Sequence, residues 1–194
     1  MEITPNNCIF VPLKEKTSVQ LKDKYFEEYI NSKDVQQLVA SVASRINEDY
    51  KGKHVVFLGV LNGAFMFAAD LLKSIDLSCE ISFVKMSSYK GTSSTGEVHE
   101  LIGLVTDLTN KHVVIVEDIV DTGLTLNKLF AMVRHDKPAS VEIATLLFKP
   151  SAFKGTEIPK YIGREIPNKF VVGYGLDYDG LGRNSDAILK LKEK

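Results

Sequence analysis

Short apolar segments separated by helix-like segments are the feature that most limits how this chain can fold. Residues 54–61 (HVVFLGVL) are apolar along almost their whole length, and residues 113–116 (VVIV) are the core of a second such segment at 111–118. Successive apolar positions are typical of strands in a parallel sheet that is covered on both faces. Further strands are predicted at residues 79–89, 140–149 and 170–174, the last of them as the final strand of the central sheet.

Three helices are predicted among these strands. Asn31 or Ser32 can cap the first, over residues 31–49, in which apolar residues recur at helical spacing: Val35, Leu38, Val39, Val42 and Ile46. The others cover residues 64–74 and 123–135. Alternating strands and helices predict an α/β fold with a mostly parallel twisted central sheet and helices on both faces. The length of 194 residues suits a single domain spanning residues 1–194.

Composition and charge argue against several classes of protein. The formal net charge of −1, with acids and bases mixed along the chain, argues against binding to nucleic acid or membranes through bulk electrostatics. No apolar run approaches the roughly 20 residues of a membrane span, and residues 1–13 lack the pattern of a signal peptide. Cys8 and Cys79 have no CxxC partner and suit a reducing compartment. We therefore expect a cytoplasmic protein without nucleic-acid or membrane partners.

Residues 113–126, VVIVEDIVDTGLTL, place several acids directly after an apolar strand. Glu117 and Asp118 end the predicted strand, Asp121 follows after two apolar residues, and TGLT at residues 122–125 begins a helix. Buried acids are costly without a partner, which hydroxyl groups or a metal ion would supply. A glycine and small hydroxyl residues at a helix start form an anion site. The segment therefore predicts a site for a ribose 5-phosphate, which presents hydroxyls beside a phosphate.

Each residue of this segment taken singly also has a simpler interpretation. The acids could lie on a solvated turn, and Thr122 could merely cap the helix. The combination EDxxDTGxT directly after VVIV is hard to explain by capping alone. Two other phosphate-binding motifs, GxxxxGK[ST] and GxGxxG after a strand, do not occur in the sequence.

The other candidates follow the predicted strands, because ligands bind at the carboxyl ends of strands in a parallel sheet. These candidates are residues 61–63, Lys149 and Asp177. Lys149 alone could be a solvated lysine, and Phe170 alone a core aromatic. The polar segment at residues 87–97 is too long for a tight turn and could be either a lid or a mobile surface loop.

Together these segments resemble the type I phosphoribosyltransferase family. VVIVEDIVDTGLTL is similar to its motif for phosphoribosyl pyrophosphate (PRPP), and VLNGA near residue 60 to its pyrophosphate loop. SSYKGTSSTGE resembles its flexible catalytic loop, and LLFK the strand that carries a purine-contacting lysine. EIPNKFVVGYGLDY, residues 165–178, is similar to the purine-binding end of the hypoxanthine and hypoxanthine-guanine members. The resemblance covers roughly residues 55–190 and implies that family's fold, with a small hood formed by the chain ends.

The resemblance implies transfer of phosphoribose from PRPP to N9 of a 6-oxopurine, with Mg²⁺ as cofactor and release of pyrophosphate. The residues implied for the ribose hydroxyls and the 5′-phosphate are Glu117, Asp118, Thr122, Gly123, Leu124 and Thr125. Those implied for pyrophosphate are Leu61, Asn62, Gly63 and Arg183. Those implied for the purine end are Lys149, Phe170, Val171 and Asp177. The implied magnesium ligands are Glu117, Asp118 and Asp177.

The resemblance also implies how the reaction is catalysed. Asp121 would lie near purine N7 as the general acid/base, and Ser88 and Tyr89 would belong to a loop that closes and excludes water. Lys149 would donate to the 6-oxo oxygen, which favours hypoxanthine and guanine over adenine. The residues leave open whether guanine is used beside hypoxanthine. Members of the family usually form homodimers or homotetramers.

One residue departs from the family pattern, and three rival interpretations are open. Asn62 stands where the family usually carries lysine or arginine, and the Leu61-Asn62 peptide is the place of a non-proline cis bond in the family. A regulator with this fold that senses PRPP or nucleotide and binds RNA would need a basic face, which the net charge of −1 does not favour. A pyrimidine or adenine transferase of the same fold is disfavoured by Lys149 and the FVVGYGLDY segment. A non-enzymatic flavodoxin-like binding domain would leave the three acids Glu117, Asp118 and Asp121 unexplained.

Overall fold

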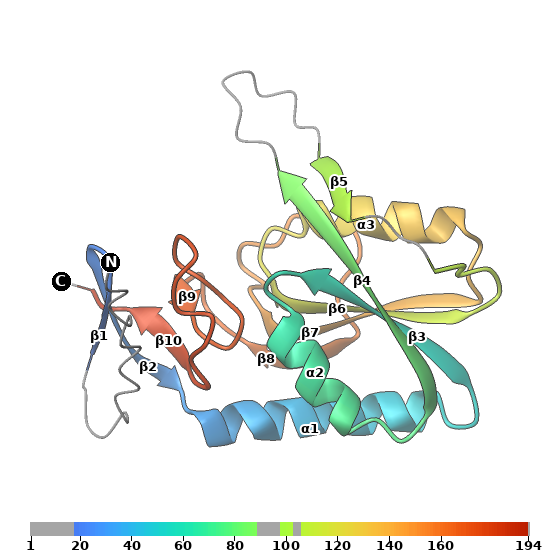
Figure 1. Cartoon of the computed structure of the whole chain (residues 1–194), viewed down its shortest axis with the longest axis horizontal. Helices are drawn as coiled ribbons and strands as arrows, with labels where there is room; N and C mark the ends of the chain where they lie inside the picture. The colour runs from blue at the N-terminus through green and yellow to red at the C-terminus, as the bar shows by residue number, and fades with distance from the viewer. Residues whose placement is uncertain (1–17, 89–97, 103–105, 194) are drawn as a thin grey trace, which may run out of the picture.

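The computed structural model describes residues 18–88, 98–102 and 106–193. Its helices and strands follow one another as β1 (Val19–Leu21), β2 (Lys24–Ile30), α1 (Ser32–Asp49), β3 (His54–Leu61), α2 (Phe65–Lys73), β4 (Ser78–Ser88), β5 (Val98–Ile102), β6 (His112–Val120), α3 (Leu124–His135), β7 (Ser140–Phe148), β8 (Tyr161–Glu165), β9 (Val171–Val172) and β10 (Ile188–Leu191). Figure 1 shows this order along the chain.

The larger sheet has six strands in the order β5-β4-β3-β6-β7-β8. All neighbouring pairs are parallel except β4 and β5. Parallel neighbours need a crossover connection, and α2 and α3 supply it between β3 and β4 and between β6 and β7. The predicted mostly parallel central sheet is therefore confirmed. Its two edge strands, β5 and β8, were not predicted because their short sequences, VHELI and YIGRE, mix polar and apolar residues.

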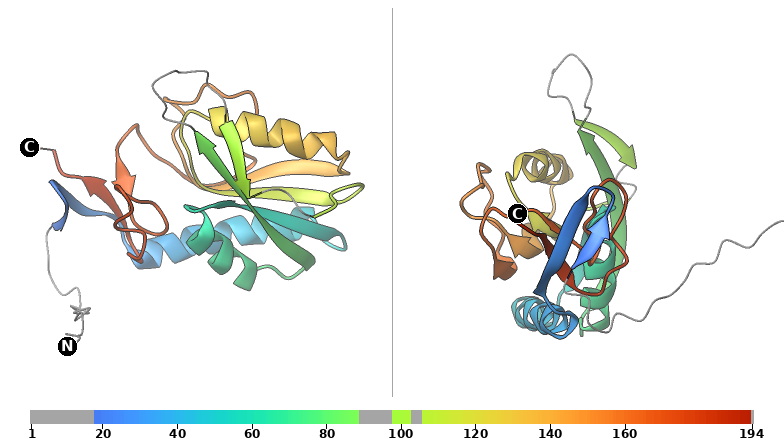
Figure 2. Two further views of the ribbon diagram at one scale, coloured as in Figure 1. Left: turned by 45° about the horizontal axis from the view of Figure 1, so that its top comes forward. Right: turned by 90° about the vertical axis from the view of Figure 1, so that its left-hand side faces the viewer.

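Helices cover both faces of this sheet, as predicted. Helices α1 and α2 lie on one face and α3 on the other (Figures 1 and 2). Residues 113–116 of β6 are continuously apolar because both faces of the strand are buried. Val114 and Val116 pack with α1 and α2, whereas Val113 and Ile115 pack with α3. The first helix begins as expected, since the side chain of Asn31 accepts a hydrogen bond from the backbone of Asp34 at 2.9 Å.

A second, four-stranded antiparallel sheet has the order β1-β2-β10-β9. It combines strands from the beginning and the end of the described chain and lies beside the larger sheet at the left of Figure 1. This is the hood of the predicted fold. The prediction that residues 170–174 form the final central strand is wrong. Strand β9 pairs with β10 instead, and it ends after two residues because Gly173, Tyr174 and Gly175 all adopt positive φ angles.

Strand β6 also runs further than its sequence indicates. It continues for two residues beyond Asp118, with Ile119 paired to Leu147 and Val120 paired to Phe148. The acids Glu117 and Asp118 therefore lie within the end of a strand, and not on a solvated turn after it. In the part of the chain that the structure describes, no helix is long and apolar enough to cross a membrane.

Candidate active site

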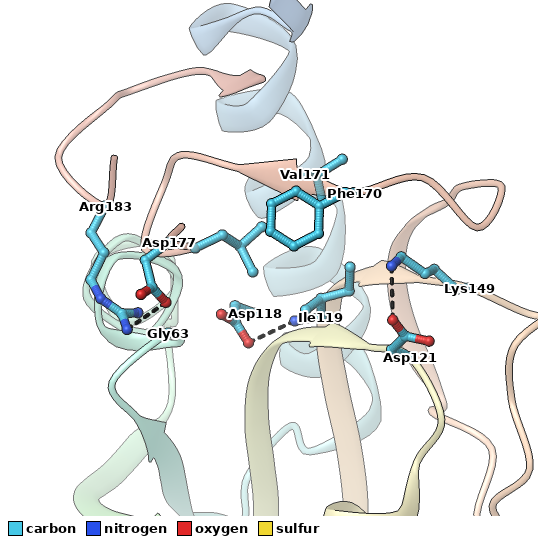
Figure 3. A pocket seen from close by; sticks show the side chains of 10 residues that line it. Gly63, Asp118, Ile119, Asp121, Lys149, Phe170, Val171, Asp177 and Arg183 are labelled. Carbon is cyan, nitrogen blue, oxygen red and sulfur yellow. Dashed lines mark hydrogen bonds and ion pairs between the residues drawn. The ribbon is translucent and has the colours of Figure 1, made fainter. Parts of the chain in front are cut away.

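A cavity of about 320 Å³ opens at the carboxyl ends of β3, β6 and β7, where it faces the segment that contains β9 (Figure 3). Eight of the seventeen residues predicted for the site meet here, although they come from five separate stretches of the chain. The residues that line the cavity are Gly63, Asp118, Ile119, Asp121, Lys149, Phe170, Val171, Leu176, Asp177 and Arg183.

The adjacent acids of β6 lie in surroundings that oppose their ionisation. Burial, followed by the nearby charge of Asp118, raises the pKa of Glu117 well above its ordinary value. Burial likewise raises the pKa of Asp118 to about 6, although the backbone N–H of Ile119 donates to its carboxylate at 2.8 Å and Arg183 opposes the rise. A cation or a set of hydroxyl donors in the cavity would favour both ionised forms.

Lys149 and Asp121 form an ion pair at one end of the cavity. The Lys149 ammonium lies 2.8 Å from a carboxylate oxygen of Asp121, and the two side chains are 7% and 43% exposed. Lys149 directly follows β7, and its backbone N–H donates to the carbonyl of Val120 at 2.9 Å, which continues the pairing of β6 and β7 past the strand ends. Lys149 is thus a buried lysine that faces the cavity, and not a solvated one.

Asp177 and Arg183 form a second ion pair at the other end (Figure 3). The Arg183 guanidinium lies 2.6 Å from one carboxylate oxygen of Asp177 and also donates to the carbonyl of Gly175 at 2.6 Å. The other carboxylate oxygen accepts a hydrogen bond from the backbone of Gly180 at 2.7 Å. These bonds hold Asp177 at the wall of the cavity with a cationic side chain beside it.

The segment that follows β3 packs tightly against β6. The Leu61-Asn62 peptide bond is cis, at the place where the family resemblance locates such a bond. Of the three residues predicted here, only Gly63 is among those that line the cavity. A Cβ atom on Gly63 would overlap with the carboxylate of Asp118, so glycine is the residue that permits this approach.

The start of α3 lies directly after Asp121. The N-cap residue is Gly123, with a φ angle of 76° and no side-chain hydrogen bond to the cap, so the interpretation of Thr122 as a simple helix cap is wrong. The backbone N–H groups of a first helical turn have no partner within the helix, and they favour an anion. Residues 122–125 are not among those that line the cavity, and they adjoin it through Asp121.

Phe170 and Val171 approach the cavity from the hood. The Phe170 side chain is 44% exposed, so it is not a core aromatic. Its ring lies 6.2 Å from that of Phe26 and 5.9 Å from that of Tyr178. Figure 3 shows the ring above the space between Asp118 and Asp121. A flat ring that is supported from behind and open toward a cavity can stack on a planar ligand.

Comparison with known proteins decides the family. Residues 26–179 match the family model described as the phosphoribosyl transferase domain. The chain belongs to the phosphoribosyl transferase family. A hypoxanthine-guanine phosphoribosyltransferase from Staphylococcus epidermidis is 46% identical to it over 164 residues, which cover 84% of this chain and 92% of the relative.

Two solved structures show the same architecture. A hypoxanthine phosphoribosyltransferase from Staphylococcus aureus superimposes with a TM-score of 0.81 and 43% identity, over 86% of this chain and 91% of its own. A hypoxanthine-guanine phosphoribosyltransferase from Bacillus anthracis gives a TM-score of 0.80 and 36% identity, over 86% of this chain and 97% of its own.

Two residues predicted for catalysis in this phosphoribosyl transferase cannot be located in the cavity. Ser88 is the last residue of β4, but its side chain is outside the described residues, and so is Tyr89 as a whole. Two cavity residues, Ile119 and Leu176, were not predicted. Ile119 lies between the predicted acids Asp118 and Asp121, and Leu176 directly precedes Asp177, so only their position beside predicted acids could have indicated them.

Replacing Asp118 with asparagine should stabilise the metal-free phosphoribosyl transferase at neutral pH. The native-state pKa of about 6 lies above the ordinary value of 3.8, so protonation stabilises the fold below about pH 4 and this contribution disappears as the pH rises through 6. Above that pH the ionised carboxylate destabilises the wild-type fold by about 1–3 kcal/mol, whereas asparagine does not. Urea unfolding of both proteins from pH 4 to pH 8, with EDTA present, measures the difference.

The control for this experiment is Asp107. Its pKa is held below the ordinary value by hydrogen bonds from Thr109, so an asparagine there should not stabilise the protein as the pH rises. A stability difference between wild type and Asp118→Asn that stays constant from pH 4 to pH 8 would contradict the raised pKa.

Proposed function

We propose that this phosphoribosyl transferase is a purine-salvage enzyme, which transfers phosphoribose from PRPP to N9 of hypoxanthine and of guanine and releases pyrophosphate. The observation that carries the proposal is the cavity itself, because the Lys149–Asp121 pair and the exposed ring of Phe170 face the same space as Asp118 of the PRPP motif. Relatives that are 43–46% identical to it over 164–167 residues are named as hypoxanthine-guanine phosphoribosyltransferases. None of the relatives reported above favours the RNA-binding alternative.

The phosphoribosyl half of the proposed site consists of β6 and the start of α3. Glu117 and Asp118 would accept hydrogen bonds from the ribose hydroxyls. The backbone of residues 122–125 would bind the 5′-phosphate, together with the hydroxyl groups of Thr122 and Thr125. This assignment is supported by the position of Asp118 at the cavity and by the α3 N-terminus, which lacks a side-chain cap.

The purine half of the proposed site lies between β7 and the hood. Phe170 would stack on the base, the backbone of Val171 would contact its edge, and Lys149 would donate to the 6-oxo oxygen. Asp121 would accept the imidazole proton at N7 while N9 forms its bond to the ribose carbon and the bond to pyrophosphate breaks. The Lys149 ammonium lies 2.8 Å from the Asp121 carboxylate, and both residues line the same cavity, which supports these two roles.

Pyrophosphate and magnesium would bind beside the phosphoribosyl half, at the end of the cavity where Asp177 and Arg183 lie. Arg183 and the backbone at residues 61–63 would contact pyrophosphate. The described residues contain no group of three or more histidine, cysteine, aspartate or glutamate side chains that could enclose a metal. Magnesium instead uses one or two carboxylates together with substrate phosphates and water. Asp118 and Asp177, which both line the cavity, fit that chemistry, and Glu117 beside Asp118 is the third candidate ligand. When bound, the ion would neutralise charge on the pyrophosphate leaving group.

Three further properties belong to the same proposal: one domain over residues 1–194, a cytoplasmic location, and a homodimer or homotetramer. An apolar surface supports the last of these. Ile81 and Phe83 point to one face of β4, and with Phe65 at the start of α2 they are 36–42% exposed. Exposed apolar side chains that lie together on a surface mark protein–protein contacts.

The proposed activity is tested by incubating the protein with hypoxanthine, PRPP and magnesium and following the ultraviolet absorbance of the product. Turnover separates an enzyme from a regulator that only binds PRPP. Specificity constants for hypoxanthine, guanine and xanthine at fixed PRPP then define the purine. A protein that turns over none of these purines with magnesium present would contradict the proposal.

Replacing Lys149 with alanine should raise the KM for hypoxanthine by about 10- to 100-fold, because a buried charged donor contributes about 1.5–3 kcal/mol. The KM for PRPP should change by less than about 3-fold, since the phosphoribosyl half does not use this side chain. Steady-state kinetics with each substrate varied in turn measures both constants.

Lys160 provides the matched control for this substitution. Its ammonium also lies 2.8 Å from a carboxylate, that of Asp49, but it is not among the cavity residues. Lys160→Ala should therefore leave both KM values unchanged. An equal loss for hypoxanthine and PRPP in Lys149→Ala would show that Lys149 is structural.

A further inference from the structure

A buried hydrogen bond outside the cavity joins the two segments that form its pyrophosphate side. Tyr174 is 1% exposed, and its hydroxyl donates to a carboxylate oxygen of Asp70 at 2.6 Å. Asp70 lies in α2, the helix that begins two residues after Gly63. Tyr174 lies in the segment that carries Asp177 and Arg183. Neither Tyr174 nor Asp70 is among the residues that line the cavity, so the roles proposed above leave this bond unexplained.

The Asp70 carboxylate is held in place from three sides. Besides Tyr174, it accepts hydrogen bonds from Gln36 of α1 at 2.9 Å and from Lys73 of α2 at 2.8 Å. Burial raises the pKa of Asp70, but these hydrogen bonds outweigh it and hold the pKa below its ordinary value. Burial and the bond to Asp70 raise the pKa of Tyr174. The pair at neutral pH is therefore a charged acceptor and a neutral donor.

The backbone around Tyr174 connects the Asp70–Tyr174 hydrogen bond to the cavity wall. Tyr174 has a φ angle of 49° between two glycines at 97° and 98°, a conformation that turns its side chain into the core. Its backbone N–H donates to the carbonyl of Ser185 at 2.8 Å, and that of Gly175 donates to Arg183 at 2.9 Å. Asp177 and Arg183 thus lie on a loop whose two sides are joined at the residue that Asp70 holds.

The same two segments also touch directly at the cavity. A Cβ atom on Gly175 would overlap with the carbonyl of Gly63, and one on Gly63 would overlap with the carboxylate of Asp118. The backbone of Gly175, the backbone of Gly63 and the side chain of Asp118 therefore pack against one another without space for a methyl group. A small shift of the Tyr174 segment away from α2 would separate Asp177 and Arg183 from Gly63 and Asp118.

We propose that Asp70 and Tyr174 are positioning residues for the pyrophosphate side of the site, and that they hold Asp177 and Arg183 in place relative to Gly63. The inference rests on the proposed function, in which that side binds pyrophosphate and magnesium. Loss of the bond weakens the binding of pyrophosphate and PRPP, and leaves the purine half, formed by Lys149 and Phe170, intact.

The chain offers a matched control for the general loss of a buried tyrosine hydroxyl. Tyr161 is also 1% exposed, and its hydroxyl donates at 2.8 Å to Asp49, which lies at the end of α1. Neither Tyr161 nor Asp49 lines the cavity. Tyr161→Phe and Tyr174→Phe therefore remove the same group from the same kind of partner, and only Tyr174→Phe removes it next to the pyrophosphate side.

The experiment compares wild type, Tyr174→Phe and Tyr161→Phe. Calorimetry gives the Kd for pyrophosphate with magnesium, and kinetics give kcat and both KM values. Tyr174→Phe should raise the Kd for pyrophosphate and the KM for PRPP by about 3- to 10-fold, with the KM for hypoxanthine within about 2-fold of wild type. Both variants should lower the melting temperature, but Tyr161→Phe should change none of the binding constants.

Asp70→Ala removes the bond from the other side and gives an independent test. It should weaken pyrophosphate binding as Tyr174→Phe does, and the double variant should be no weaker than Asp70→Ala alone, because the bond is already lost. Wild-type protein that binds no pyrophosphate would overturn the proposed function and this inference with it. If wild type binds and Tyr174→Phe binds equally well, or Tyr161→Phe is weakened to the same extent, this inference alone is overturned.

Discussion

Replacing Asp121 with asparagine should lower the rate of phosphoribosyl transfer to hypoxanthine by about 10²–10⁴-fold, which is the usual contribution of a general acid/base. Asparagine keeps the size of the side chain but cannot accept a proton at neutral pH. In the free protein the Asp121 carboxylate lies 2.8 Å from the Lys149 ammonium. The substitution therefore removes both the proton acceptor and the charge that faces Lys149, whereas the acids of β6 are unchanged.

Single-turnover kinetics, in which enzyme exceeds substrate, measure this rate separately from product release. Calorimetry of PRPP with magnesium should show a Kd within about 3-fold of wild type. Asp136→Asn is the control, because Asp136 lies at the opposite end of α3 from the cavity and should leave the rate unchanged. A wild-type single-turnover rate in Asp121→Asn would remove Asp121 from the proposed role.

Replacing Gly63 with alanine should lower kcat/KM for PRPP by at least about 100-fold, because misplacement of a reacting group by about 1 Å can have an effect of that size. The added Cβ atom would overlap with the carboxylate of Asp118. Either Asp118 or the backbone that follows β3 must then move. Both belong to the proposed site for ribose, pyrophosphate and magnesium.

The measurement is kcat/KM for PRPP, accompanied by thermal unfolding to show that the variant is folded. Gly52→Ala is the control, because Gly52 has a φ angle of 75° and no atom within 4 Å of the added Cβ position. It should lower stability slightly through backbone strain and leave kcat/KM unchanged. Wild-type activity in Gly63→Ala would show that the position of the Asp118 carboxylate is not important for PRPP.

The sequence by itself was sufficient for the central sheet and its helices, since these depend on local patterns. Strands β3 and β6 are apolar at successive positions, and Asn31 caps α1. The acids Asp118 and Asp121 could be predicted as cavity residues because their place is also set by a local pattern. They lie at the carboxyl end of a parallel strand, and ligands bind at that end of such sheets.

Only the tertiary structure decided how the purine half and the pyrophosphate side of the site are built. Strand β9 belongs to the hood because it pairs with β10, which pairs in turn with β2 from the other end of the chain. The pairing of Lys149 with Asp121 and of Tyr174 with Asp70 joins residues that are 28 and 104 positions apart. Such contacts depend on the packing of whole elements against one another, and no periodicity in a short stretch of sequence reports them.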